Sequence, residues 1–147
     1  MRAGELAAEF PSVSLAAPVL DVAPLLGTRE LPGVIVLDDA GRPYTVLPGT
    51  ELLRLAVPRY CQENPALARV VDEAHADRFL EGLRGRTVRD CLPREPGELP
   101  IVETDATVLE VAALMARTRS PVVAVMDGST MLGAITLHAL LRRILSP

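Results

Sequence analysis

The sequence predicts an α+β fold that consists of two tandem β-α-β-β-α repeats joined by a helical connector. Three observations predict it. A 28-residue segment recurs 89 positions further along the chain, both copies alternate strand-like and helix-like stretches in the same order, and the residues between them carry an apolar stripe at helical spacing. We expect a first repeat at residues 1–57, a connector at 58–85 and a second repeat at 86–147.

The duplication is visible when residues 11–38 are set against residues 100–127 without a gap. Twelve of the 28 positions are identical: Pro11/Pro100, Val13/Val102, Ala17/Ala106, Val19/Val108, Leu20/Leu109, Val22/Val111, Ala23/Ala112, Leu25/Leu114, Pro32/Pro121, Val34/Val123, Val36/Val125 and Asp38/Asp127. So many identities at one offset indicate a tandem duplication.

Each copy opens with a short strand and an amphipathic helix. The strands contain Val13 and Val102, which occupy the same place in the two copies. In the second copy, the apolar face of the helix consists of Val108, Val111, Ala112 and Met115. Thr107 and Glu110 have the spacing of a capping box, which predicts that this helix begins after Thr107.

A hairpin and a second helix complete each copy. Apolar runs at 33–37 and 122–126 predict the second strands, and turn signals separate each from a third strand. Gly133 in the last strand allows another segment to pass close by, and Thr136 stands where that strand ends.

The connector is predicted to be helical. Asn64 followed by Pro65 is a helix-start signal, and Gly85 is a plausible stop. One apolar stripe is formed by Leu67, Val70, Val71 and Ala74. We expect an ordered helix that packs beside the repeats with Leu67, Val70 and Val71 directed inward.

Composition argues against several classes of protein. The net charge of −4 disfavours a nucleic-acid partner, and no apolar run is long enough for membrane insertion. Glu5 and Glu9 interrupt the stretch where a secretory signal would be apolar, so we expect a cytoplasmic protein. Cys61 and Cys91 match no metal spacing and are expected to be buried free thiols. Without a recognisable catalytic or metal motif, we expect neither an enzyme nor a metal site.

These features together resemble a tandem cystathionine-β-synthase (CBS) domain pair. The resemblance is carried by the twin β-α-β-β-α pattern, the first-helix motif around residues 108–115, the hairpin at 121–128 and the Gly133 to Thr136 strand end, and it covers nearly all of the chain except the connector. It implies a regulatory module whose repeats are related by a pseudo-twofold axis. Many such pairs bind adenosine compounds in two clefts.

The resemblance also implies a set of ligand-binding residues. The family pattern is Gly, two apolar residues, Thr or Ser, two variable residues and Asp. The second copy supplies Gly133 and Thr136 but has Ala139 in place of the acid, whereas the first copy has Pro48 in place of the hydroxyl and Glu51 at the acid position. The candidate residues are Thr136, His138, Val102, Pro121 and Val122 in the second copy, and Glu51, Thr50, Val13, Pro32 and Gly33 in the first.

Three of these residues have an alternative interpretation. Thr136 could bind phosphate or ribose, or could simply cap a helix. Glu51 could hold ribose hydroxyls, or could be a solvated carboxylate that suits the helix dipole. His138 could face a phosphate, or could be an ordinary surface histidine.

Two hypotheses about function follow. The first is a regulatory CBS pair that senses AMP, ADP, ATP, S-adenosylmethionine or another small ligand in the cleft between the repeats and signals to a partner protein. The second is a ligand-free dimerising module that regulates a separately encoded transporter or enzyme. In both, apolar helix faces are expected to produce a homodimer.

Overall fold

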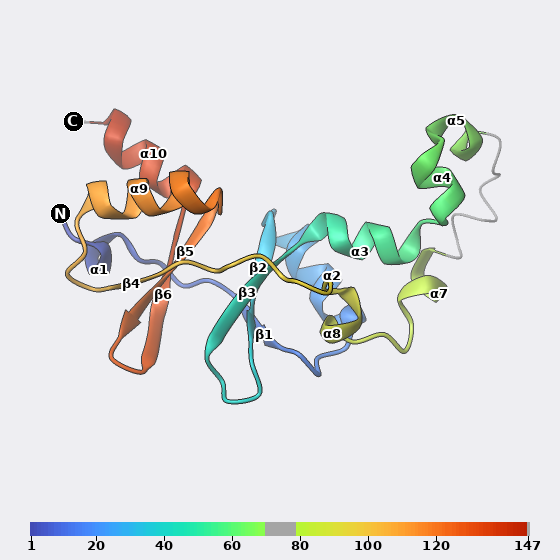
Figure 1. The fold of residues 1–147 in the computed structure, drawn as a ribbon, viewed down its shortest axis with the longest axis horizontal. Coiled ribbons are helices and arrows are strands. Elements are labelled where there is room, and N and C mark those ends of the chain that lie inside the picture. Colours follow the sequence, from blue (N-terminus) through green and yellow to red (C-terminus); the bar gives the residue numbers. More distant parts are fainter. Residues whose placement is uncertain (70–78, 147) are drawn as a thin grey trace.

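The computed structural model describes residues 1–69 and 79–146, and in them the β-α-β-β-α order appears twice (Figure 1). The prediction of an α+β fold with two such repeats is confirmed. The first half contains β1 (Ser12–Ser14), α2 (Val19–Thr28), β2 (Gly33–Leu37), β3 (Pro43–Pro48) and α3 (Gly49–Ala56). The second contains β4 (Ile101–Glu103), α9 (Val108–Thr118), β5 (Val122–Asp127), β6 (Thr130–Thr136) and α10 (Leu137–Leu145).

Each half has a three-stranded sheet of the same topology. The order is β1-β2-β3 in one sheet and β4-β5-β6 in the other, with the first pair parallel and the second antiparallel. Pro48 lies opposite Gly33 and Thr136 lies opposite Val122, so the ends of the two hairpins correspond. The third strands are therefore related by an offset of 88 residues (136 minus 48), one less than the strands before them.

The buried side chains form three clusters. One lies under the helices of the first half around Val22 and Val34, and a second lies under those of the second half around Val111 and Val123. The third cluster joins the sheets, and it consists of Phe10, Ile35, Leu99, Val122, Ala124 and Ala134. The strand residues of this layer, Ile35, Val122, Ala124 and Ala134, are small or β-branched, and Phe10 and Leu99 from outside the strands complete it.

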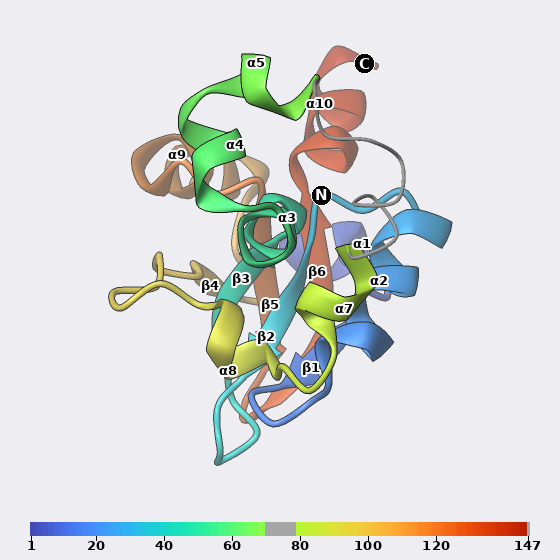
Figure 2. The same cartoon turned by 90° about the vertical axis from the view of Figure 1, so that its right-hand side faces the viewer.

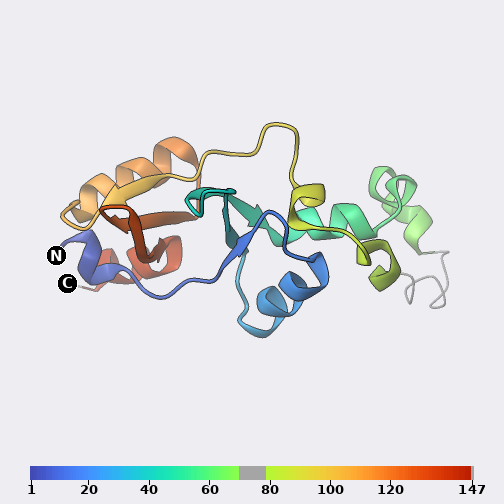
Figure 3. The same cartoon turned by 90° about the horizontal axis from the view of Figure 1, so that it is seen from below.

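Two short helices each pack on the half of the molecule to which they do not belong in sequence. α1 (Ala3–Leu6) precedes the first repeat but packs on the second: the backbone N–H of Ala3 donates to the carbonyl of Ala106 at 2.8 Å. α8 (Val88–Cys91) precedes the second repeat but packs on the first, where the N–H of Val88 donates to the carbonyl of Ala17 at 2.9 Å. The segments that follow these two helices, residues 7–11 and 92–100, cross between the halves. Figure 3 shows these two crossing segments running in opposite directions.

The crossing segments also bond to the sheets. Ala8 and Ala134 exchange two backbone hydrogen bonds, and a Cβ added at Gly133 would lie 2.5 Å from the carbonyl oxygen of Ala8. In the first half, the buried hydroxyl of Thr45 donates to the carbonyl of Gly97 at 2.6 Å. The expected close approach at Gly133 is thus confirmed, and the segment that approaches is the crossing segment around Ala8.

In its described residues, 58–69 and 79–85, the connector contains short helices rather than one continuous helix. They are α4 (Arg59–Glu63), α5 (Pro65–Ala68) and α7 (Phe79–Leu83). The helix start at Asn64 is confirmed, because its side chain accepts from the N–H of Ala66 at 3.2 Å. The inward position expected for Leu67 is wrong: α5 is a single turn on the outside of α4, and Leu67 is 40% exposed. Val70, Val71 and Ala74 lie outside the described residues.

Candidate functional site

The end of the second hairpin forms one candidate corner, at the point where β6 runs directly into α10. Thr136 is the N-cap of α10, and its hydroxyl accepts from the N–H of Ala139 at 3.1 Å. The N–H of Leu137 donates to the carbonyl of Pro121 at 2.8 Å, which holds the start of α10 against the start of β5. The capping role considered for Thr136 is therefore present, and it leaves the hydroxyl hydrogen available to a ligand.

Of the remaining candidates of the second copy, Val122 and His138 lie at this corner and Val102 lies further along the sheet. Val122 is buried at the start of β5 and lies opposite Thr136 in the ladder. His138 is exposed on the first turn of α10. Val102 lies on β4, where it pairs with Val125, three residues further along β5 than Val122.

The first half contains the equivalent corner with different chemistry. The N–H of Gly49 donates to the carbonyl of Pro32 at 3.0 Å, which repeats the bond between Leu137 and Pro121. Pro48 occupies the N-cap of α3 and provides no side-chain hydrogen bond. Thr50 is exposed, and Gly33 is buried against the backbone of β3. This corner therefore has no hydroxyl at the position of Thr136.

Glu51 and Val13 complete the first-copy candidates. Val13 lies on β1, opposite Val36. The side chain of Glu51 is only 20% exposed, and its carboxylate forms an ion pair with Arg54 at 3.3 Å. Glu51 is thus paired within its own helix. Its carboxylate, in the first turn of α3, also interacts favourably with the helix dipole.

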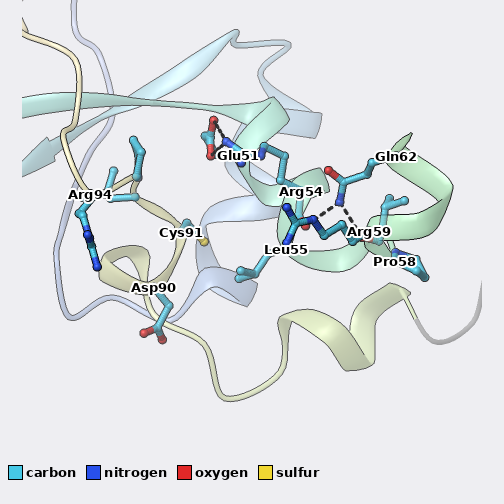
Figure 4. A pocket seen from close by; sticks show the side chains of 12 residues that line it. Glu51, Arg54, Leu55, Pro58, Arg59, Gln62, Asp90, Cys91 and Arg94 are labelled. Carbon is cyan, nitrogen blue, oxygen red and sulfur yellow. Dashed lines mark hydrogen bonds and ion pairs between the residues drawn. The ribbon is translucent and has the colours of Figure 1, made fainter. Parts of the chain in front are cut away.

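Glu51 also lines a hollow of about 700 Å³ between α3, α4 and the α8 segment (Figure 4). Arg54, Arg59 and Arg94 contribute guanidinium groups to its wall. The amide of Gln62 donates to the carbonyls of Arg54 and Val57, at 3.0 and 2.8 Å, and fastens α4 to the end of α3. The hollow is therefore lined by three guanidinium groups and by the carboxylates of Glu51 and Asp90.

Two further groups in the hollow have shifted pKa values. The pKa of Asp90 is lowered, first because the backbone N–H of Thr87 donates to its carboxylate at 2.8 Å. The pKa of the Cys91 thiol is raised by burial, and the carboxylates of Asp90 and Glu51 add to the rise. Cys91 is therefore a protonated, weakly nucleophilic thiol at neutral pH.

Most of the residues that form this hollow with Glu51 were not predicted from the sequence. Arg59 and Gln62 belong to α4, and Asp90, Cys91 and Arg94 belong to α8 and the segment after it. One available signal was the Thr87-to-Asp90 spacing, which is a capping box in the structure. The contact between α8 and α3 could not be inferred, because α8 precedes the second repeat in sequence but packs on the first half.

The structure thus divides the candidate residues between two corners. Thr136, Val122, Pro121 and His138 gather at the start of α10, while Gly33, Pro32, Thr50 and Glu51 gather at the start of α3. Thr136 and Glu51 belong to different halves, so each corner carries one part of the family pattern.

Among residues 1–69 and 79–146, no group of three or more His, Cys, Asp or Glu side chains is arranged to hold a metal ion. Within the same residues, no helix combines the length and the apolar character needed to cross a membrane.

Similarity to known proteins adds to this geometry. The CBS domain model matches residues 88–146, and no match to a curated protein is found. A CBS domain-containing protein of unknown function from Kribbella flavida is 46% identical, with a TM-score of 0.88, and the match covers 98% of this chain and 99% of that chain.

More distant solved structures share the fold. The CBS domain of a CBS domain-containing membrane protein from Sphaerobacter thermophilus is 17% identical, with a TM-score of 0.72, over 97% of this chain and 86% of that chain. CBSX2 from Arabidopsis thaliana, in a structure with AMP, is 20% identical, with a TM-score of 0.67, over 98% of this chain and 96% of that chain. The Kribbella flavida match spans both repeats at high identity. The chain therefore belongs to the CBS domain family and is a CBS-pair module.

Proposed function

We propose that this CBS pair is a cytoplasmic regulatory module that binds an adenosine nucleotide at the corner formed by Thr136 and transmits the binding to a partner protein. The observation that carries the proposal is the position of the Thr136 hydroxyl. It caps α10 as an acceptor, at 3.1 Å from the N–H of Ala139, and so retains a hydrogen that can be donated to a phosphate or ribose oxygen.

The electrostatics of the corner favour an anion. The amino end of a helix carries partial positive charge, and α10, Leu137–Leu145, begins directly after Thr136. His138 is exposed on the same turn, where its imidazole can turn toward a bound phosphate. The fold shared with CBSX2, whose structure contains AMP, supports an adenosine nucleotide as the ligand.

The missing acid limits the expected affinity. Ala139 stands where the family pattern has an acid that holds ribose hydroxyls, so the ribose would lose a charge-assisted hydrogen bond. Glu51 supplies a carboxylate in the first half, but its pairing with Arg54 must be given up before it can bind ribose. We therefore expect weak binding, with the Thr136 corner as the principal site.

Signalling would follow from differential binding. A ligand that contacts both halves favours the arrangement of repeats or subunits that it binds best. The partner is proposed to be a separately encoded transporter or enzyme, reached by a homodimer of this chain.

Thermal shift with AMP, ADP, ATP and S-adenosylmethionine at millimolar concentration tests the proposal. At 100 times the dissociation constant a ligand adds about 2.7 kcal/mol, which for a chain of this size raises the melting temperature by about 5–10 °C. Thr136→Val should abolish the shift because the donating hydroxyl is removed, and Glu51→Ala tests the first corner.

Thr107→Val is the matched control. The Thr107 hydroxyl caps α9 by accepting from the N–H of Glu110 at 3.1 Å, the same length as the Thr136 cap. Both variants should lose about 1 kcal/mol of helix capping, but only Thr136→Val should lose the ligand shift. If wild type responds to none of the four ligands, or if Thr107→Val loses the shift equally, the Thr136 corner does not bind nucleotide.

A ligand-free interaction module is the second candidate. It is favoured by the departures from the family pattern at Pro48 and Ala139, and by the exposed apolar side chains on α10, such as Leu141 and Ile144. A dimer that responds to no nucleotide would support it.

A further inference from the structure

The two crossing segments differ in length. Residues 7–10 separate α1 from Pro11, whereas residues 92–99 separate α8 from Pro100, the counterpart of Pro11 in the duplication. The second segment is therefore four residues longer, with eight residues against four. Figure 2 shows it projecting from the body of the molecule between α8 and β4. Its extra length gives it slack that the first segment lacks.

The first crossing segment is bound to its sheet by the backbone. Ala8 and Ala134 exchange two backbone hydrogen bonds, at 3.0 and 2.9 Å, and Gly133 leaves the space that this pairing needs. In the first half, Thr45 and Gly97 occupy the positions of Gly133 and Ala8, at offsets of 88 and 89 residues. Because Thr45 has the Cβ that Gly133 lacks, the second crossing segment cannot approach β3 in the same way.

A single side-chain bond replaces this pairing in the first half. Thr45 is 1% exposed, and its hydroxyl donates to the carbonyl of Gly97 at 2.6 Å. Within the described part of the chain, no backbone hydrogen bond joins residues 93–99 to β3. Pro93 and Pro96 have no N–H with which to form one. The second segment is therefore attached to its sheet more weakly than the first.

The apolar anchors of the two segments are matched. Phe10 and Leu99 are counterparts at the offset of 89 residues, and both enter the layer between the sheets. They are 7% and 5% exposed. The difference in attachment thus comes from the bonds to the sheets and from the length of the segments.

Both ends of the second segment are held independently of Thr45. At its start, the N–H of Arg89 in α8 donates to the carbonyl of Leu15 at 3.0 Å. At its end, the N–H of Ala124 donates to the carbonyl of Pro100 at 3.0 Å. α8 and β4 can therefore keep their positions when the residues between them move.

The second segment also divides two hollows. Pro93 and Arg94 line the hollow of about 700 Å³ that contains Glu51 (Figure 4). The same two residues line a second hollow of about 240 Å³ beside Tyr44. A movement of this segment away from β3 would join the two hollows.

We propose that residues 93–99 form a gate that opens while α8, β4 and the rest of the fold remain in place. In the closed state the Thr45 hydroxyl holds Gly97, and the two hollows are separate. In the open state this bond is broken, Leu99 leaves the layer between the sheets, and the hollows are continuous. The first crossing segment has no corresponding open state and is released only when the protein unfolds. The gate does not depend on nucleotide binding at the Thr136 corner.

A glutamate-specific protease tests the gate, because the chain offers two matched cleavage sites. Glu9 and Glu98 are counterparts, and each is exposed and is followed by a buried apolar residue and a proline. Below the urea concentration that unfolds the protein, cleavage after Glu98 should be at least about tenfold faster than after Glu9 and should depend little on urea, because local opening exposes little surface. Cleavage after Glu9 should rise steeply with urea. Mass spectrometry measures both rates, and unfolded peptides of the two sequences correct for the preference of the protease.

Two variants separate local opening from unfolding. Gly133→Ala should speed cleavage after Glu9 at least about fivefold but leave cleavage after Glu98 within about twofold of wild type, because Gly133 keeps its contacts when the gate opens. Thr45→Val removes a bond that is broken in both processes, so it should speed cleavage at both sites by a similar factor of about five.

The urea dependence of wild type is decisive even if a variant fails to fold. The same dependence at Glu9 and Glu98 would overturn the proposal, because the two segments would then open by one process. An equal response of both sites to Gly133→Ala would also overturn it, as would a Thr45→Val protein that is cleaved after Glu98 no faster than wild type.

Discussion

Gly133 illustrates how a single residue without a side chain brings the two halves together. A methyl group there would lie 2.5 Å from the carbonyl oxygen of Ala8, and the neighbouring Ala134 exchanges two backbone hydrogen bonds with Ala8. The crossing segment can pair with β6 only because this position is glycine. The sequence indicated a close approach but could not identify the approaching segment, which lies more than 120 residues away in the chain.

Gly133→Ala should therefore destabilise the protein. The expected loss is about 1–3 kcal/mol, the range for a side chain forced into a filled space, and it should appear as a lower midpoint in urea unfolding. Gly27→Ala is the control, because nothing lies within 4 Å of its added Cβ and its backbone is helical. That variant should be neutral or more stable by up to about 1 kcal/mol. Equal loss in both would contradict the steric explanation.

Glu51 shows the limit of residue patterns for the candidate site. Its spacing to Arg54 is typical of a helix ion pair, which the structure contains at 3.3 Å. Which hollow its carboxylate lines depends on how α4 folds back after α3 and on α8, which comes from the start of the second repeat. Local sequence can therefore place an acid on the first turn of a helix but cannot determine what it faces.

At the level of elements, long periodic segments were predictable and single-turn helices were not. The strands and the helices α2, α3, α9 and α10 follow from alternating and helical spacing. α1 and α8 are four residues each, too short for a periodic pattern, and their offset of 85 residues differs from the 89 of the main repeat. The expected inward stripe of the connector was wrong at Leu67 because it assumed one continuous helix.

The capping box of α8 should make stability depend on pH. The pKa of Asp90 is lower in the folded chain than its ordinary value of 3.8, chiefly because the N–H of Thr87 donates to its carboxylate. Its contribution is therefore present above the unfolded pKa and is lost as the pH falls through the folded pKa.

Asp90→Asn should consequently be less stable than wild type at pH 7, and the two should converge as the pH falls through the folded pKa of Asp90, because the carboxylate is then protonated in both states. Urea midpoints measured across this range provide the check. The exposed Glu95→Gln variant serves as a control and should follow wild type throughout. A constant difference between Asp90→Asn and wild type at every pH would show that its carboxylate charge is irrelevant.

At the scale of the whole molecule, the stability of each half depends on the other, because α1 packs on the second half and α8 packs on the first. Ala3 bonds to Ala106 in the second half, and Val88 bonds to Ala17 in the first, while a shared apolar layer lies between the sheets. Neither half can lose its structure without exposing buried surface of the other. We expect one cooperative unfolding transition.

Hydrogen exchange can verify this cooperativity. The slowest amides of β2 and β5 should exchange with the same free energy of opening, and alkylation of the buried Cys91 thiol should follow the same urea dependence. The contrary result would be a step in which β5 exchanges while β2 and Cys91 remain protected.

The crossing of the N-terminal segment also affects the order in which the protein folds during synthesis. The side chain of Arg2 donates to the carbonyl of Asp105, a contact that spans 103 positions. Until the ribosome has made the residues around Asp105, α1 has no partner, and such distant contacts slow folding. α1 is thus made long before it can be buried, and the second repeat assembles onto a segment that preceded it by about a hundred residues.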